Sequence, residues 1–207
     1  MIKQNIKDIR MAIAFGLIFS MMLCFVRFDA ECTKIRQSVL RFHVLANSDS
    51  DEDQSLKLKV RDRLLLEADN LFADTSTEEE AIVVARNNLL QLQQVAQEEI
   101  VDCGYDYPVT VEIGKAYFNT RVYDTFTLPA GNYEAVRVLI GEAKGKNWWC
   151  VMFPPVCVPA AMADASIEDV LDESQTDIVE NSDSYEIRFK TVEVFEEAKD
   201  YLSKIFK

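Results

Sequence analysis

This chain of 207 residues is poor in histidine and in basic residues. It contains one histidine, and 22 Lys and Arg stand against 35 Asp and Glu, so the formal net charge is −13. Binding to nucleic acid requires Lys and Arg to neutralise phosphates, and an acidic field repels them. We therefore exclude nucleic acid as a partner.

The sequence also lacks the patterns of common metal and hydrolase sites. One histidine and five scattered cysteines give no zinc-type ligand spacing. The acidic stretch 49–53 resembles the start of an EF-hand loop, but Gln54 replaces the turn glycine and Val60 replaces the bidentate Glu. No Gly-x-Ser-x-Gly motif is present. We predict no metal, no cofactor and no catalytic residue.

The one long apolar run lies near the N-terminus. Three basic residues precede residues 11–26, which carry no charge and end at Arg27. A basic region followed by an apolar one is typical of a secretory signal. These residues would span about 24 Å as a helix, less than the roughly 30 Å of a hydrocarbon core. Residues 1–30 are predicted to be a signal peptide cleaved after Ala30, or an uncleaved signal anchor.

Residues 31–207 are predicted to form a single exported domain. Without residues 1–27 the chain loses four basic residues and one acidic residue, which changes the net charge from −13 to −16. About 180 residues suffice for one domain with its own core. The acidic, Ser-rich stretch 160–184 is expected to be mobile around a short helix. Membrane contact is expected only through the N-terminal segment, if that segment stays uncleaved.

Hydrophobic periodicity predicts an α+β fold, an antiparallel sheet packed by helices. Stretches of alternating apolar and polar residues are expected as strands: 38–46, 107–114, 121–128, 133–140, 147–153 and 185–190. Apolar residues recur at helical spacing in three stretches: 51–71, 75 to about 104, and 191–206.

The densest group of aromatic and cysteine residues lies at 145–157. Because neighbouring residues of a strand face opposite sides, one of Trp148 and Trp149 can fill the core while the other anchors a partner. Cys150 and Cys157 bracket a proline pair. They are candidates for a disulfide in an oxidising compartment, with two buried free thiols as the alternative.

Four segments resemble the stage II sporulation protein R family of endospore-forming bacteria: 40–50, 54–62, 128–137 and 145–157. The resemblance implies a signalling protein that the forespore exports across its membrane into the space between forespore and mother cell. There the family triggers a membrane-bound aspartic-type protease of the mother cell, which cleaves a sigma-factor precursor. The resemblance implies a ligand without catalytic residues.

The motif positions supply the candidates for contact with the protease: Arg41, His43, Asn47, Asp49, Arg137, Asn147, Trp148 and Trp149. The motifs also contain Lys57, Arg61 and Cys150, which serve either the fold or the partner. The alternative is a secreted hydrolase that uses Cys150 and His43 on envelope material, and a third class is a passive envelope-binding module. A cleft joining the Cys150 sulfur to His43 favours the hydrolase.

Overall fold

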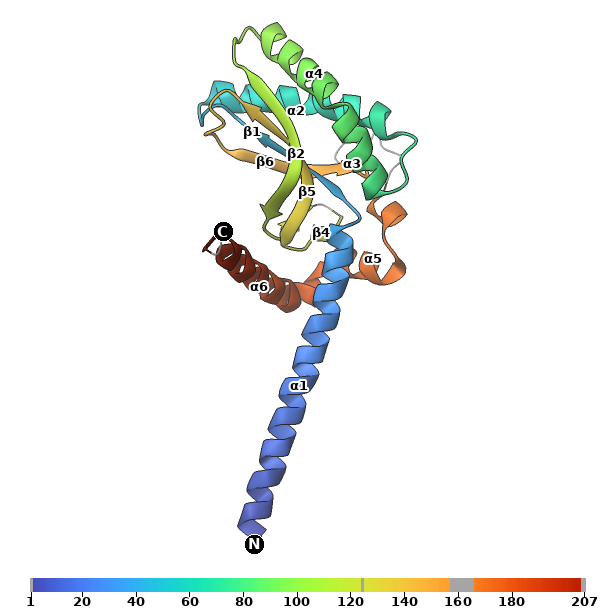
Figure 1. Ribbon diagram of the computed structural model, residues 1–207, viewed down its shortest axis with the longest axis vertical. Coiled ribbons are helices and arrows are strands. Elements are labelled where there is room, and N and C mark those ends of the chain that lie inside the picture. Colours follow the sequence, from blue (N-terminus) through green and yellow to red (C-terminus); the bar gives the residue numbers. More distant parts are fainter. Residues whose placement is uncertain (1, 124, 157–165, 206–207) are drawn as a thin grey trace.

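A four-stranded mixed sheet forms the centre of the computed structural model, which describes residues 2–123, 125–156 and 166–205 (Figure 1). Its strands, in the order β2-β5-β1-β6, are β2 (Val109–Phe118), β5 (Gly131–Ile140), β1 (Leu40–Leu45) and β6 (Asn147–Phe153). β1 runs parallel to β5, and the other two pairs are antiparallel. The predicted α+β class is confirmed.

The parallel pair makes the sheet mixed rather than wholly antiparallel. Three helices follow β1, and the chain then returns through β2 and its antiparallel partner β5. This route places β5 beside β1 with both strands pointing the same way. Alternation of apolar residues predicts where strands lie, but it carries no information on which strands become neighbours.

Three helices cover one face of the sheet: α2 (Asp51–Phe72), α3 (Glu78–Asn87) and α4 (Leu89–Asp102). Ser50 and Thr77 cap α2 and α3 by accepting hydrogen bonds from backbone N–H groups. The prediction of a single helix over 75–104 is wrong, because α3 ends and α4 begins on either side of Asn88. The Asn88 side chain donates to the carbonyl of Val84, which also accepts the helical bond from the Asn88 backbone N–H, and α3 ends here with Asn88 outside helical φ and ψ.

The second face is packed by α1 (Ile2–Arg36), α5 (Glu173–Glu180) and α6 (Glu186–Ile205), with short 3-10 turns η1 (Ile167–Val170) and η2 (Ser182–Tyr185). α1 continues without a break from the apolar run into the body, where Phe28, Cys32 and Ile35 are buried. The last turns of α1 therefore belong to the second core.

Two predicted strands differ in the structure. The strand predicted for 185–190 is wrong, because α6 begins at Glu186 and buries Phe189 and Val192 on one helical face. The stretch 121–128 forms a separate hairpin of β3 (Arg121–Val122) and β4 (Thr127–Leu128). Six alternating residues fit either element, and here the packing of Phe189 against Phe28 decides.

The rest of α1 stands clear of the body as a stem (Figure 1). Within α1, the stretch Asp8–Arg36, which includes most of this stem, is long and apolar enough to cross a membrane, and its most apolar window is 0% buried. This observation fits both a signal peptide and a signal anchor. In the stretch 160–184, a short helix is present as α5, with Ile178 and Val179 buried; residues 157–165 lie outside the described residues.

Candidate partner-binding face

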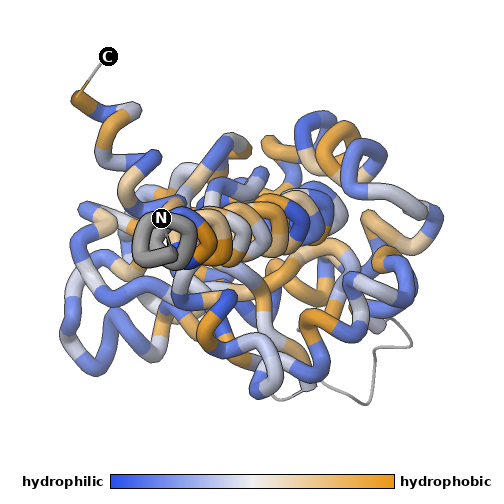
Figure 2. Tube along the Cα trace, turned by 90° about the horizontal axis from the view of Figure 1, so that it is seen from below, coloured by the Kyte–Doolittle hydropathy of each residue, from blue (hydrophilic) through white to orange (hydrophobic). Residues whose placement is uncertain are grey.

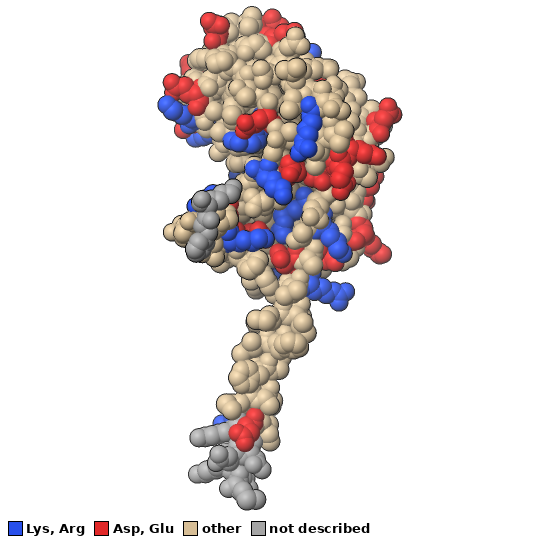
Figure 3. Space-filling view, viewed as in Figure 1, with Lys and Arg blue, Asp and Glu red and all other residues tan. Residues whose placement is uncertain are grey.

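The second face of the sheet has a covered half and an open half. At the Leu40 end of β1, residues of α1, α5 and α6 bury the sheet. At the other end, side chains from the three other strands are exposed or partly exposed around His43 of β1: Glu112, Arg137, Asn147 and Trp149. We call these five residues the open half. Figure 3 shows Lys and Arg side chains gathered where the body meets α6, beside a hollow.

His43 and Trp149 form the centre of the open half. They lie directly opposite each other on β1 and β6, and their rings stack with centres 3.7 Å apart and planes 10° from parallel. The rings of Phe118 and Trp149 make a T-shaped contact, with centroids 4.6 Å apart. His43 is consequently buried beneath Trp149, which stays partly exposed.

The environment of His43 keeps its imidazole neutral. Burial lowers the pKa of His43 to about 4, and nearby Arg137 adds to the shift although a hydrogen bond to Asn147 opposes it. His43 Nε2 lies 2.7 Å from Asn147 Oδ1, and donation to that oxygen requires the proton on Nε2. His43 thus positions Asn147 and supports Trp149.

The sequence did not predict two further side chains of this face. Glu112 belongs to the open half, and Arg121 lies at its border. Glu112 Oε1 accepts a hydrogen bond from Arg137 Nη1 at 2.7 Å across the β2–β5 pair. The Arg121 guanidinium carbon lies 5.9 Å from the centroid of the Trp149 ring. Neither Glu112 nor Arg121 carries a signal in the linear sequence, since both gain their place from strand pairing and packing.

Arg41 points into the covered half and is fully buried. Its guanidinium lies over three aromatic rings and is 4.3 Å from the centroid of Phe118. It donates to the carbonyl of Cys150 at 3.0 Å and to the Tyr123 hydroxyl at 2.8 Å. Burial lowers the pKa of Arg41. The structure therefore places this candidate in the core.

Asn47 holds the loop after β1 in place. Its Oδ1 accepts from the backbone N–H of Glu142 at 2.9 Å, and its Nδ2 donates to Asp53 at 2.8 Å. Ser48 also donates to Asp53, at 2.6 Å. Burial alone would raise the pKa of Asp53, but these hydrogen bonds outweigh it and lower the pKa. A side chain at Gly141, where φ is +57°, would collide with Asn47.

Asp49 fastens the start of the 145–157 segment to the same loop, and Lys57 fastens it to α2. Asp49 Oδ1 accepts from the backbone N–H of Lys146 at 2.7 Å, and Lys57 donates to the Lys146 carbonyl at 3.0 Å. Gly145 lies so close to the Ser48 carbonyl that no Cβ fits there. Asn47, Asp49 and Lys57 thus build the fold at one end of the open half.

The two tryptophans face opposite sides of β6. Trp148 packs edge-on to Phe42 on the helix side, with ring centroids 6.1 Å apart, and the Arg61 guanidinium lies 4.7 Å above its ring. Trp149 belongs to the open half. Of the eight candidates, the structure brings together His43, Arg137, Asn147 and Trp149.

Cys150 and His43 lie on opposite faces of the sheet. Cys150 pairs with Phe42, shares the helix-side core with it and is 2% exposed. The strand backbone therefore separates the sulfur from the imidazole, and the arrangement that the hydrolase needs is not formed. The predicted pairing of Cys150 with Cys157 stays a prediction, since Cys157 lies outside the described residues.

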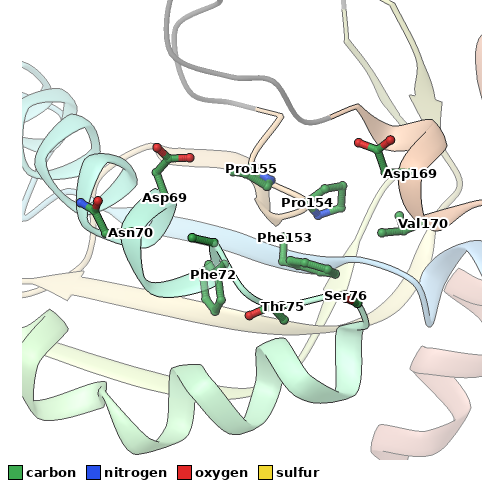
Figure 4. A pocket seen from close by; sticks show the side chains of 11 residues that line it. Asp69, Asn70, Phe72, Thr75, Ser76, Phe153, Pro154, Pro155, Asp169 and Val170 are labelled. Atoms are coloured by element: carbon green, nitrogen blue, oxygen red, sulfur yellow. The ribbon is translucent and has the colours of Figure 1, made fainter.

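One hollow in the described part of the chain contains none of the candidates. Its volume is about 690 Å³, and it lies between the end of α2, the turn after β6 and η1 (Figure 4). Phe72, Phe153 and Pro154 line it, with Asp69 and Asp169 at its rim. Within the described ranges no group of three or more His, Cys, Asp or Glu is placed to hold a metal ion.

The motif residues described above fall within one region of family similarity. The model of the family "Stage II sporulation protein R" matches residues 36–163, which is more than half of the chain. The chain belongs to this family. All eight candidate residues lie within the matched region.

A relative in Bacillus subtilis (strain 168), named stage II sporulation protein R, is 39% identical over 123 residues. The match covers 59% of this chain and 55% of the relative, so the chain spans about half the length of that protein. No solved structure matches. The C-terminal helices α5 and α6 lie beyond the residues matched by the family model.

Proposed function

We propose that this chain is an exported signalling ligand of sporulation. The forespore secretes it into the space between forespore and mother cell, where it activates a membrane-bound aspartic-type protease and so leads to cleavage of a sigma-factor precursor. In this proposal the ligand acts by contact, without catalytic residues of its own.

The observation that carries the proposal is the grouping of four family-motif residues on the open half. Other motif side chains, such as Arg41 and Asn47, make hydrogen bonds and ring contacts within the fold. Trp149 remains partly exposed at the centre, as expected of an aromatic residue that anchors a partner. The open half is therefore the surface that we assign to the protease.

The test co-expresses the chain with the protease and the sigma-factor precursor and follows precursor cleavage. Trp149→Ala should weaken binding by on the order of 2 kcal/mol, as loss of a hot-spot aromatic does. Because this change also uncovers His43, a second variant leaves the core intact. Thr110→Arg places a bulky side chain on an exposed position of β2, on the face of the open half, and should also reduce cleavage.

Two matched variants serve as controls. Ser55→Arg adds the same side chain to an exposed position of α2, and Trp148→Ala removes the tryptophan of the opposite face. Folded forms of both should retain cleavage. Equal loss in Thr110→Arg and Ser55→Arg would reject the open half as the contact surface. Turnover of a small substrate by the isolated protein, lost in Cys150→Ser, would instead support the hydrolase.

A further inference from the structure

α6 carries a row of large apolar side chains that the described part of the chain leaves uncovered. Its members are 45% to 82% exposed: Ile187, Val194, Phe195, Tyr201, Leu202 and Ile205. We call this row the α6 stripe. Soluble monomers rarely expose a contiguous apolar patch of this kind unless it contacts something.

The opposite side of α6 packs on the body. Phe189, Val192 and Glu196 are buried, and Glu196 lies 3.7 Å from the Arg36 guanidinium at the inner end of α1. Burial, together with the acidic residues of α6, raises the pKa of Tyr117 to about 12, as expected when those acids face β2. Because each residue turns a helix by about 100°, the α6 stripe points away from the sheet.

The α6 stripe lies where α1 leaves the body. The ring of Phe195 meets the ring of Phe25 edge-on, with centroids 5.4 Å apart, and Phe25 is near the end of the apolar run 11–26. Met21 and Met22, just before it on α1, are more than 60% exposed. Figure 2, viewed along α1 from its N-terminal side, shows α6 running outward beside it. The α6 stripe thus continues the apolar surface of α1.

We propose that α6 lies on the lipid surface of the membrane that α1 enters, with the α6 stripe buried at the boundary of headgroups and acyl chains. An exposed apolar helix stripe binds in this way. The opposite side of α6 packs on the body, so only the α6 stripe and the residues that flank it can reach lipid. α6 carries both acidic and basic residues, so apolar burial rather than lipid charge drives the contact. Since α1 tethers α6 at the surface, even weak affinity suffices.

This second membrane contact fixes the orientation of the body. With α1 as its sole anchor, the body would tilt and rotate together with that helix in the bilayer, whereas α1 and α6 together restrain it at two places. The open half then has a defined direction relative to the membrane. The inference concerns lipid and is independent of the proposed protease.

The test uses the full chain in phosphatidylcholine vesicles and the fluorescence of an added tryptophan. Leu202→Trp places the probe on the α6 stripe, and the control Lys204→Trp places it two residues later at an exposed charged position outside the α6 stripe. The signal of Trp148 and Trp149 is subtracted with the unmodified chain. Lipids brominated on their acyl chains should quench the Leu202→Trp probe several-fold more strongly than the Lys204→Trp probe.

Two outcomes would overturn the proposal. Equal quenching of both probes would show that the α6 stripe does not face lipid. A blue-shifted Leu202→Trp emission that bromine does not quench, and that fades as the protein is diluted in lipid, would show that a second copy of the chain covers the α6 stripe instead.

Discussion

The imidazole of His43 lies flat against the indole of Trp149, 3.7 Å away between ring centres. Both residues come from family motifs, and their pairing depends on the antiparallel register of β1 and β6. The stack buries the only histidine of the sequence and leaves the tryptophan partly exposed. This one contact therefore both stabilises the fold and shapes the surface that we propose for the partner.

His43 should make the stability of the fold depend on pH. Its pKa is about 4 in the folded chain, against an ordinary value of 6.5, so the unfolded state takes up the proton first as the pH falls. Stability should decrease between pH 6.5 and pH 4, by about 2 to 4 kcal/mol from this group. Urea unfolding of His43→Gln across this range should lack that part of the decrease. An unchanged pH profile would contradict the buried neutral imidazole.

Glu78 should change the stability of the fold with the opposite sign over an overlapping pH range. Burial and the nearby acids Glu79 and Glu134 raise its pKa from 4.5 to about 7. The folded state therefore holds the proton, and this stability is lost as the pH rises from 4.5 through 7. Glu78→Gln should gain about 2 kcal/mol relative to the unmodified chain between pH 4.5 and pH 8, measured by urea unfolding. Glu79→Gln, at an exposed position, is the control and should show a smaller change.

Asn47→Ala should destabilise the loop after β1. The change removes hydrogen bonds to the Glu142 backbone and to Asp53, and it leaves polar groups without their partners. A loss of about 2 kcal/mol is expected from two such bonds. Thermal unfolding of Asn132→Ala, at an exposed position of β5, supplies the comparison. Similar losses in both variants would rule out the special role of Asn47.

Phe28→Ala tests whether the inner end of α1 belongs to the folded body. Phe28 is 5% exposed and contacts the rings of Tyr185 and Phe189. Its loss should cost about 3 to 4 kcal/mol, whereas Val26→Ala, at an exposed position, should change stability by less than about 0.5 kcal/mol. Unfolding in detergent measures both. A chain that begins at residue 31 should be destabilised in the same way as Phe28→Ala relative to one that begins at residue 25.

Local pattern was sufficient where neighbours in the sequence decide the structure. The apolar stripe of α2 and the alternation of β2, β5 and β6 predicted these elements to within a few residues. The basic and apolar order of the N-terminus and the acidity of the remaining chain were likewise readable directly. The prediction of one helix across Asn88 failed because a side-chain hydrogen bond outweighed the local pattern there. The prediction of a strand at 185–190 failed because the contact between Phe28 and Phe189 favoured a helix.

The sequence alone determined the α+β class, the apolar N-terminal segment, the acidic character of the chain and the motif residues of its family. Only the tertiary structure decided that Trp149 lies on the face of His43 and Trp148 on the helix side, that Arg41 is buried among rings, and that Cys150 and His43 are kept apart. The physical reason is register: side chains of a strand alternate between two faces, so pairing between distant segments determines which residues meet.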